Sequence, residues 1–334
     1  MGVCVVLVSW NGWAHTLECL ESLFRQSVPG MAVVVCDNDS QDGSPERIRD
    51  WAEGRLAAAV DPQHPLAALT LPPVPKPVRL VEYGRAEAEA GGSAGEDAPL
   101  VLVRTGGNLG FAGGNNVGLR YALAHGGFDH VWLLNNDTVA APGALAALLA
   151  AARADPGAGM VGSKLLYYDR PHVVQAWGGA HYNAWLALPR HAGCGRAADE
   201  VPPPSGPRIS YVVGASMLVP TRFVREVGLM SEEYFLYFEE MDWAMRARGR
   251  YHTAYAPESV VYHKEGASVG RPSTHRKSWT ADYHFMRSRL LFTRKHLPTR
   301  LPTVYVALAA AMLRRARHGQ WDRVRMIARL CLAR

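Results

Sequence analysis

The stretch that decides the fold is Val131-Trp132-Leu133-Leu134-Asn135-Asn136-Asp137-Thr138. Four consecutive apolar residues are typical of a strand that is buried on both faces, as in a parallel sheet. This strand then ends abruptly in two amides and a carboxylate. Residues 32–36 repeat the pattern, because that apolar run ends in Asp37-Asn38-Asp39-Ser40. Ligands of open α/β sheets bind at the carboxyl ends of strands, so both clusters are candidate sites.

Outward from these clusters, strand and helix signals alternate along the first half of the chain. The predicted strands are residues 3–8, 32–36, 100–103 and 131–134, and the predicted helices are residues 16–24, 45–51, 115–124 and 142–153. Ser44 is the predicted N-cap of the second helix, with Pro45 at its first position. Such alternation predicts an α/β fold with a mostly parallel central sheet flanked by helices.

Two regions depart from this alternation. Residues 57–99 are rich in Pro, Ala and Gly, and we predict an insertion that is partly ordered at best, with an edge strand at 78–82. The second half is predicted to contain strands at 160–167 and 211–220, a loop at 193–207, and helices at 221–227 and 241–248. The tail from Trp279 is predicted to be helical, with breaks at Pro298 and Pro302. We divide the chain into a domain of residues 1–270 and an extension of residues 271–334.

Charge divides along the same boundary. The 334 residues carry a formal charge of +6, and 48% of them are hydrophobic, which is ordinary for a folded protein. Residues 271–334 hold 15 Lys and Arg against 2 Asp and Glu, a charge of +13, so residues 1–270 carry −7. An acidic body without a recognised nucleic-acid motif opposes nucleic acid as a partner.

Cysteine use and hydropathy indicate the compartment. The five cysteines are odd in number and irregular in spacing, with no CxxC pair, so neither a disulfide framework nor a zinc site is expected. No uncharged apolar run reaches the roughly 18 residues of a spanning helix. We therefore expect a cytoplasmic protein.

Polar clusters suggest a nucleotide site. Asp37, Asp39 and Asp42 lie within six residues, and a carboxylate at a strand end can accept a hydrogen bond from a ribose or a base N–H. The alternative is an Asx-turn with a helix cap. Residues 108–116 are glycine-rich before a helix, so their backbone can approach an anion. They match neither a dinucleotide fingerprint nor a Walker loop, and a simple tight turn is the alternative.

Two further segments suggest a metal site and a base. Asp137 with neighbouring amides suits Mg²⁺, which binds one or two carboxylates together with substrate phosphates, although a turn is the alternative. His263 could ligate Mn²⁺ if the fold brings it beside Asp137, whereas a lone histidine is more often structural. Glu239, Glu240 and Asp242 lie among aromatic residues, where a raised pKa suits a general base. The alternative is a helix N-terminus stabilised by acids.

Taken together and in order, these motifs resemble a known family. They comprise Val6-Leu7-Val8-Ser9-Trp10-Asn11, residues 37–44, residues 108–116, Leu134-Asn135-Asn136-Asp137-Thr138, residues 237–243 and His263. As a set, over about residues 1–270, they resemble the inverting family-2 glycosyltransferases with a GT-A fold. The likeness is greatest to the bacterial rhamnosyltransferase-like and galactofuranosyltransferase-like branches.

The resemblance implies roles for individual residues. The nucleotide pocket would involve Ser9, Asn11, Asp37, Asp39, Asn108, Gly113, Gly114, Asn115 and Asn136. The metal, Mg²⁺ or Mn²⁺, would be held by Asp137 with His263 and Asn135, where Asn135 replaces the first acid of the family's D-x-D-type motif. Glu240 stands where the family has its catalytic base, usually an aspartate, next to Glu239, and Asp242 is the alternative base. Residues 177–179 and 214–217 resemble acceptor-side segments.

The function implied is sugar transfer with inversion. The donor would be a nucleoside-diphosphate sugar, with dTDP-rhamnose as the first hypothesis, and the acceptor a hydroxyl of a glycan or lipid-linked molecule in cell-surface polysaccharide synthesis. A GT-A-like nucleotidyltransferase is the enzymatic alternative, but residues 3–12 lack the Lys or Arg that a triphosphate needs. A non-catalytic nucleotide- or nucleic-acid-binding protein is the third hypothesis.

The basic tail has two interpretations. In residues 319–334, Trp321, Val324, Ala328 and Cys331 fall at helical spacing among arginines. Such a helix can lie on an anionic membrane, which would place the protein peripherally on the inner face of the cell membrane. The alternative is a helix docked on the body. The sequence does not indicate an oligomeric state.

Overall fold

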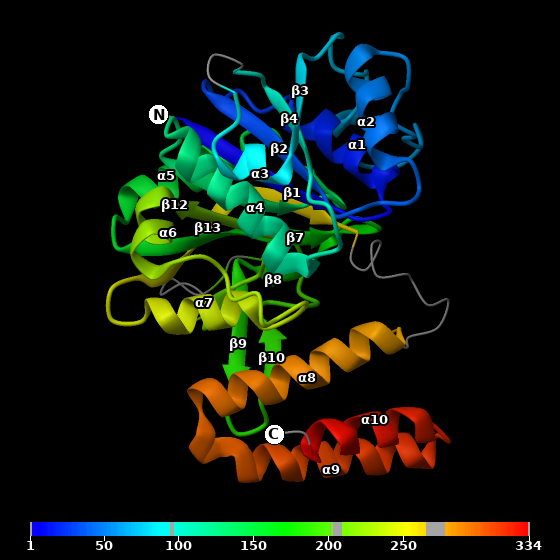
Figure 1. The fold of residues 1–334 in the computed structure, drawn as a ribbon, viewed down its shortest axis with the longest axis vertical. Coiled ribbons are helices and arrows are strands. Elements are labelled where there is room, and N and C mark those ends of the chain that lie inside the picture. Colours follow the sequence, from blue (N-terminus) through cyan, green and yellow to red (C-terminus); the bar gives the residue numbers. More distant parts are fainter. Residues whose placement is uncertain (1, 94–96, 201, 203–208, 265–277, 333–334) are drawn as a thin grey trace.

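The computed structural model describes residues 2–93, 97–200, 202, 209–264 and 278–332. Figure 1 shows a body with helices on both sides of a central sheet, and a separate helical group, α8 to α10, at the opposite end of the long axis. The N-terminus lies in the body and the C-terminus in the helical group.

The central sheet is mixed and mostly parallel, as predicted. Its order is β3-β4-β2-β1-β5-β12-β7-β13-β6, with β8 paired to β7. The strands of its parallel half are β1 (Val3–Ser9), β2 (Met31–Asp37), β3 (Leu80–Gly84), β4 (Leu100–Arg104) and β5 (His130–Asn135). The other half comprises β6 (Thr138–Ala140), β7 (Ala158–Tyr167), β8 (Arg170–Trp177), β12 (Ser216–Pro220) and β13 (His252–His263). There β12 runs antiparallel to both β5 and β7, whereas β13 is parallel to β7.

Strand register brings the polar strand ends together. Ser9 at the end of β1 is paired with Asp37 at the end of β2, and Val8 is paired with Asn135 at the end of β5. Because these strands are parallel, the clusters that follow them emerge at one edge of the sheet.

Helices cover both faces of this sheet because strand side chains alternate between the faces. Val3, Val5 and Leu7 of β1 belong to one apolar cluster, whereas Cys4 and Val6 belong to the other. The first cluster is covered by α1 (Trp13–Leu23), α2 (Ser44–Glu53) and α5 (Ala144–Ala154). The second is covered by α4 (Gly110–His125), α6 (Thr221–Val227) and α7 (Glu239–Ala247).

The region predicted to be a poorly ordered insertion holds more regular structure than expected. It contains η1 (Ala67–Leu69), the edge strand β3 and α3 (Arg85–Glu89). The buried carboxylate of Glu21 holds part of it in place, because it accepts hydrogen bonds from Trp51 Nε1 at 2.8 Å and from the Val74 N–H at 2.7 Å. The edge strand was predicted and β3 confirms it, whereas η1 and α3 were not predicted, and the Glu21 anchor lies in α1, far away in sequence.

Several predicted boundaries were wrong in detail. Ser44 is the first residue of α2 rather than its N-cap, and Asp42 accepts a hydrogen bond from the Ser44 N–H at 3.1 Å. The helix predicted from residue 115 begins at Gly110. The strand predicted at residues 211–220 is two strands, β11 (Tyr211–Val212) and β12. Pro302 does not break the tail but lies in the first turn of its second helix.

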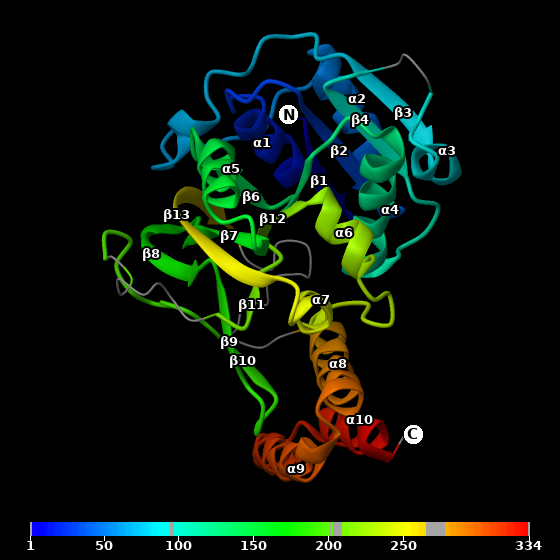
Figure 2. The ribbon, with the colours of Figure 1, turned by 90° about the vertical axis from the view of Figure 1, so that its left-hand side faces the viewer.

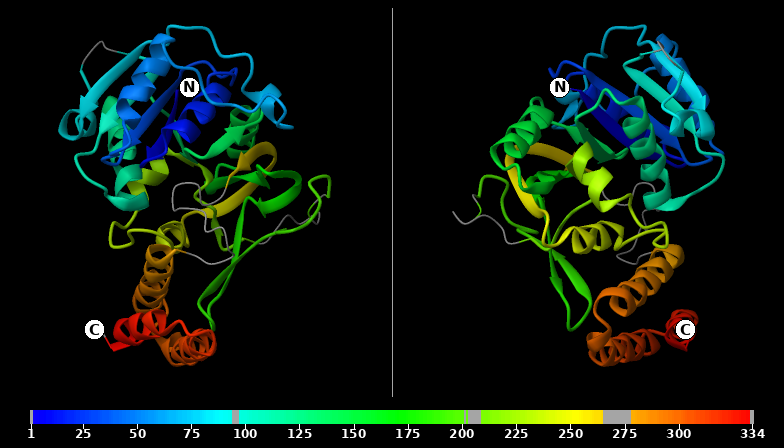
Figure 3. Two further views of the ribbon diagram at one scale, coloured as in Figure 1. Left: turned by 90° about the vertical axis from the view of Figure 1, so that its right-hand side faces the viewer. Right: turned by 60° about the vertical axis from the view of Figure 1, so that its left-hand side comes forward.

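The helical group is tied to the body by a hairpin. The helical group consists of α8 (Trp279–His296), η2 (Pro298–Arg300), α9 (Leu301–Arg317) and α10 (Trp321–Leu332). The hairpin of β9 (Gly179–Asn183) and β10 (Leu188–His191) forms a small sheet with β11 and extends from the body to α9 (Figures 2 and 3). Ala187 from the tip of the hairpin is buried in one apolar cluster with Val304, Leu308 and Ile327.

Among the described residues, no helix is both long and apolar enough to cross a membrane. All five cysteines are free.

Close packing of α4 on β1 gives a testable prediction. A Cβ on Gly118 would lie 2.4 Å from Val6 Cγ1, in a buried strand. Ala in a helix interior is ordinarily more favourable than Gly by about 1 kcal/mol. We nevertheless expect Gly118→Ala to lower the free energy of unfolding by about 1–3 kcal/mol because of this overlap. Urea titration should be compared with Gly84→Ala, whose Cβ would meet no atom within 4 Å. A more stable Gly118→Ala variant would contradict the packing.

Candidate active site

The first part of the site is the turn after β2. Asp37 is buried, and its Oδ2 accepts a hydrogen bond from the Ser40 N–H at 3.1 Å. Its Oδ1 has no hydrogen-bond partner among the described residues. Burial raises the pKa of Asp37, and the Ser40 hydrogen bonds offset this only partly. An unsatisfied carboxylate oxygen at a strand end is suited to accept a hydrogen bond from a ligand.

Two left-handed residues join this turn to the end of β1. Asn11 has φ 50° and Asp39 has φ 64°, a conformation that non-glycine residues seldom adopt. The Asn11 side-chain oxygen accepts a hydrogen bond from the Gln41 N–H at 2.7 Å, and the backbone N–H of Asn11 donates to Ser40 Oγ at 2.9 Å. Asn11 and Asp39 are both exposed beside Asp37. The two strand ends therefore form one rigid polar surface.

Ser9 and Asn136 have internal partners. The Ser9 side chain is buried, with its Oγ 3.1 Å from Thr16 Oγ1. Asn136 is also buried and donates from Nδ2 to the same Thr16 hydroxyl at 3.0 Å. These contacts fix the ends of β1 and β5 relative to α1.

The glycine-rich segment forms the first turns of α4. Asn108 is exposed and its Oδ1 accepts a hydrogen bond from the Gly110 N–H at 3.0 Å. Gly113, Gly114 and Asn115 are buried inside the helix. A Cβ on Gly114 would lie 2.7 Å from Val8 Cγ1, so this glycine permits α4 to approach β1. Asn115 donates to the Phe111 carbonyl at 2.9 Å.

The end of β5 brings Asp137 and His263 together. His263 Nε2 lies 3.2 Å from Asp137 Oδ1 and 3.3 Å from Asn135 Nδ2. Burial by itself would raise the pKa of Asp137, but the adjacent His263 holds it below its usual value. The described residues contain no group of three or more His, Cys, Asp and Glu side chains arranged to hold a metal ion. Asp137 and His263 supply one carboxylate and one imidazole, both of which are side chains that can ligate a divalent cation.

The sequence reasoning missed several polar neighbours of this pair. Gln175 of β8 is buried, and its Oε1 lies 2.9 Å from His263 Nδ1. This contact orients the His263 ring. Lys264 forms an ion pair with buried Glu18 and lies 3.1 Å from His15 Nδ1. Lys264 directly follows His263, which was a usable signal, whereas Gln175 and His15 come from distant elements.

The second part of the site is the start of α7. Tyr237 and Phe238 both have positive φ, 69° and 75°, immediately before Glu239. Two consecutive non-glycine residues in this region indicate strain that surrounding contacts maintain, and such strain concentrates at functional sites. Glu239 is buried, and its Oε2 has no partner among the described residues. Burial raises the pKa of Glu239 well above its usual value, and the Glu240 charge adds to this.

Glu240 is linked to the end of β5 through one short segment. Its Oε1 accepts a hydrogen bond from the Gly214 N–H at 3.0 Å. The next residue, Ala215, accepts a hydrogen bond from the Asn135 N–H at 3.1 Å. A Cβ on Gly214 would lie 2.5 Å from Glu240 Oε1, so glycine is needed for this contact. Burial raises the pKa of Glu240, although the Gly214 N–H opposes the rise.

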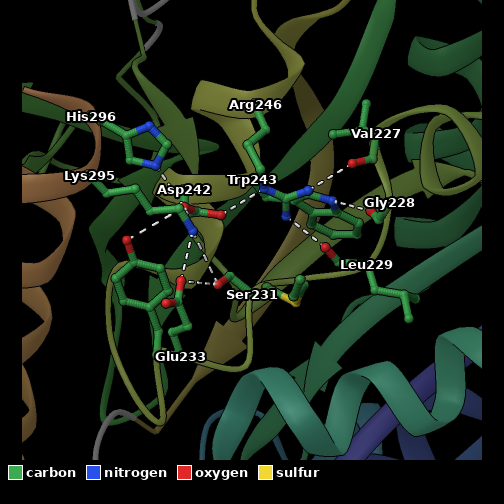
Figure 4. Close-up of polar contacts among 12 residues, drawn as sticks. Val227, Gly228, Leu229, Ser231, Glu233, Asp242, Trp243, Arg246, Lys295 and His296 are labelled. Atoms are coloured by element: carbon green, nitrogen blue, oxygen red, sulfur yellow. Dashed lines mark hydrogen bonds and ion pairs between the residues drawn. The ribbon is translucent and has the colours of Figure 1, made fainter.

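Asp242 lies in a separate polar cluster between α7 and α8 (Figure 4). Its side chain is fully buried, with Arg246 Nε at 2.8 Å, His296 Nε2 at 2.7 Å and Lys295 Nζ at 3.2 Å. Arg246 also donates to the carbonyls of Val227 and Leu229. Burial by itself would raise the pKa of Asp242, but hydrogen bonds from His296 and Arg246 hold it below its usual value.

Comparison with known families agrees with this geometry. The model described as "Glycosyltransferase like family 2" matches residues 89–281, more than half of the chain. The chain belongs to glycosyltransferase family 2. A second model, "Glycosyl transferase family 2", matches residues 4–62, which include β1, β2 and the turn at Asp37. The protein is therefore a glycosyltransferase.

This chain is similar in sequence to a protein from Mycobacterium tuberculosis. That protein is an N-acetylglucosaminyl-diphospho-decaprenol L-rhamnosyltransferase, 27% identical over 282 residues, which are 81% of this chain and 79% of the relative. The relative supports the rhamnosyltransferase-like branch inferred from the motifs.

Solved structures show the GT-A fold. The mannosyltransferase PcManGT from Pyrobaculum calidifontis, in complex with GDP-Man and Mn²⁺, has a TM-score of 0.50 at 16% identity, covering 98% of this chain and 84% of its own. GalNAc-T7, with UDP, GalNAc and Mn²⁺, has a TM-score of 0.56 at 13% identity, covering 86% of this chain and 47% of its own.

The cluster around Asp242 predicts a pH-dependent stability difference. We expect Asp242→Asn to lower the free energy of unfolding by about 3 kcal/mol at neutral pH, because Arg246 and Lys295 lose a buried counter-charge. The pKa of Asp242 is lower in the folded than in the unfolded state. Its ionised carboxylate therefore stabilises the fold fully at pH values above the unfolded-state pKa. This stabilisation is lost as the pH falls through the folded-state pKa. The difference between wild type and variant should therefore shrink on acidification. Urea titrations at neutral and acid pH measure it, and a constant difference would argue against the ion pairs.

Proposed function

We propose that this glycosyltransferase transfers a sugar with inversion, using Glu240 as general base. The main support is a pair of hydrogen bonds at neighbouring residues. Glu240 accepts one from the Gly214 N–H, and the Ala215 carbonyl accepts one from the Asn135 N–H. Glu240 therefore lies near the strand end that is followed by Asp137. Support also comes from the pKa of Glu240, which burial raises toward the range that suits proton transfer near neutrality.

The nucleotide would bind over the ends of β1 and β2. Asp37 Oδ1, buried and unsatisfied among the described residues, would accept a hydrogen bond from a base N–H. Asn11 and Asp39 would border this pocket, and Asn108 would lie at its α4 side. Ser9, Asn136, Gly113, Gly114 and Asn115 would act indirectly, since their buried positions shape the backbone around the pocket.

The donor diphosphate would lie at the end of β5. Asp137 and His263 would hold Mg²⁺ or Mn²⁺ there, with Asn135 beside them. A bound divalent cation neutralises charge on the departing nucleoside diphosphate. Gln175 would keep the His263 ring oriented through its hydrogen bond to Nδ1.

Of the three acids on α7, Glu240 fits the base best. Glu239 is buried and its Oε2 has no partner among the described residues, and burial raises its pKa well above its usual value, which disfavours the charged form that a base needs. Asp242 is enclosed by Arg246, Lys295 and His296, and would position α7 rather than touch substrate. Glu240 would remove the proton of an acceptor hydroxyl as that oxygen attacks the anomeric carbon.

The substrates are inferred from the Mycobacterium tuberculosis relative. That protein's description names an L-rhamnosyl group and a diphospho-decaprenol carrying N-acetylglucosamine. We propose dTDP-rhamnose as donor and a lipid-linked glycan as acceptor, in cell-surface polysaccharide synthesis. Peripheral attachment to the membrane and a domain boundary near residue 270 are parts of the same proposal.

Substitution of the base tests the assignment. We expect Glu240→Gln to lower kcat by roughly 10²–10⁴-fold while donor binding stays intact, because only proton removal is lost. Glu239→Gln is the matched control and should retain most activity, because glutamine resembles the protonated acid. Nucleoside-diphosphate release and donor binding by calorimetry measure both. Full turnover by Glu240→Gln would disprove the assignment.

The pH profile of the wild type adds a second readout. A base with a raised pKa is protonated and inactive at low pH, so kcat/KM should rise with pH. The apparent pKa of this rise should lie above the usual glutamate pKa of about 4.3. An acid limb at or below that range would contradict the burial of Glu240.

Removal of the metal ligand tests the diphosphate site. We expect Asp137→Asn to weaken Mn²⁺-dependent binding of dTDP or UDP at least about tenfold, with little change in binding without metal. Asp97→Asn, an exposed acid that pairs with His125, is the control. Calorimetry with Mn²⁺ and with chelator distinguishes the two cases. Equal metal dependence in both variants would exclude Asp137 as a ligand.

A further inference from the structure

Helix α9 is apolar on two opposite faces. On one face, Val304 and Leu308 are buried against Met326 and Ile327 of α10 and against the hairpin residue Ala187. On the opposite face, Val306 is 71% exposed and Leu313 is 63% exposed. A surface helix normally carries charged or polar residues on the face that points away from its core. The outer face of α9 therefore lacks the residues that water would favour.

This outer face is continuous. Residues 301–313 contain no charged side chain, and Val306, Ala309, Ala310 and Leu313 follow one another at helical spacing, all exposed. We call these four residues the α9 face. The tip of the β9–β10 hairpin, which packs at the start of α9, also exposes Trp185 and Leu186, at 55% and 44%.

Contacts hold the hairpin tip against the start of α9. Thr303 Oγ1 donates a hydrogen bond to the Trp185 carbonyl at 2.7 Å. The Arg300 guanidinium lies 3.6 Å from the centroid of the Trp185 ring. Figure 2 shows the hairpin reaching α9 at the end of the molecule farthest from the main sheet. The hairpin tip is thus fixed relative to α9.

Unpaired positive charge adjoins the α9 face. Residues 278–332 contain eleven Lys and Arg against two Asp and Glu. One of the two acids, Asp282, is occupied by Arg315 and Arg323. Within the described part of the chain, Arg314 and Arg317 of α9 are exposed and form no ion pair, and Arg317 lies one turn after Leu313.

The apolar side of α10, suggested by the sequence as the membrane-facing helix, is used differently. Met326 and Ile327 are buried against α8 and α9, and Leu330 and Cys331 pack on the same cluster. This docked packing is the alternative that the sequence left open. It leaves the arginines of α10 outside and makes α9 the helix with an uncovered apolar face.

We propose that the α9 face rests on the surface of an anionic phospholipid bilayer. Exposed aliphatic side chains would enter the interfacial region, while Arg314 and Arg317 contact the headgroups. A second copy of the chain would bring like charges together, which disfavours a dimer through this face. The need for a membrane rests on the proposed lipid-linked acceptor, whereas the surface itself is argued from exposure and charge.

The same surface is connected to the catalytic helix. Strand β9 of the hairpin pairs with β11, where Tyr211 lies opposite Ala180, and β11 ends two residues before Gly214. Gly214 in turn holds Glu240. Because the hairpin tip is held on α9, contact of the α9 face with a bilayer would orient the acceptor side of the site relative to the membrane.

Vesicle flotation of the full chain tests the proposal. We expect the wild type to float with vesicles of phosphatidylcholine mixed with phosphatidylglycerol, and much less with phosphatidylcholine alone. Val306→Glu combined with Leu313→Glu should lower the bound fraction at least about tenfold, because two charges would have to enter the interface. Both side chains are exposed, so the thermal unfolding midpoint should not change.

The control carries the same charge change on the body, as Gln63→Glu combined with Ser93→Glu, both exposed. It should float like the wild type. Equal flotation of the α9 variant and the control would overturn the proposal. So would a wild type that binds neither vesicle but is a dimer by light scattering and becomes a monomer in the α9 variant. Because flotation requires no sugar transfer, its outcome is independent of the proposed catalytic function.

Discussion

Parallel pairing of β1 with β2 and β5 is the constraint on which the site depends. The register places Ser9 opposite Asp37 and Val8 opposite Asn135, so three strands that are distant in sequence end at one edge. Buried apolar side chains on both faces of β1 maintain this register, because a shift by one residue would move each side chain to the wrong core. The turn at Asp37 and the Asp137–His263 pair follow directly from that edge.

The acceptor side depends on a different set of contacts. Antiparallel β12 next to β5 brings Gly214 and Ala215 to the same edge, and Gly214 receives the Glu240 carboxylate. Behind Glu240, buried Asp242 joins α7 to α8 through Arg246, Lys295 and His296. Two acids separated by one residue thus have opposite pKa shifts, one raised by burial and one lowered by hydrogen bonds. Helix α7 and the start of the basic extension, α8, are consequently packed together.

The sequence predicted the elements whose signals are local. Buried apolar runs located β1, β2, β4 and β5, and the polar clusters after β1, β2 and β5 lie together at one edge of the sheet, as parallel pairing predicts. The proximity of Asp137 and His263 was stated only as a condition, because it requires β13 to lie beside β7 and β6. The ordering of residues 57–93 by Glu21, the support of His263 by Gln175 and the pairing of Asp242 with His296 were not predictable, since each joins distant segments. The α9 face was also missed, because the sequence alone does not indicate which apolar side of a helix is covered.

The central claim is a single displacement in which Glu240 deprotonates the acceptor at the shared strand edge. The most direct test is the anomeric configuration of the first-formed product, measured by NMR with whichever nucleoside-diphosphate sugar the enzyme uses. The account predicts a product whose anomeric configuration is inverted relative to the donor from the first turnover onward. A product that retains the donor configuration would contradict it, because retention requires a route other than direct attack by the deprotonated acceptor.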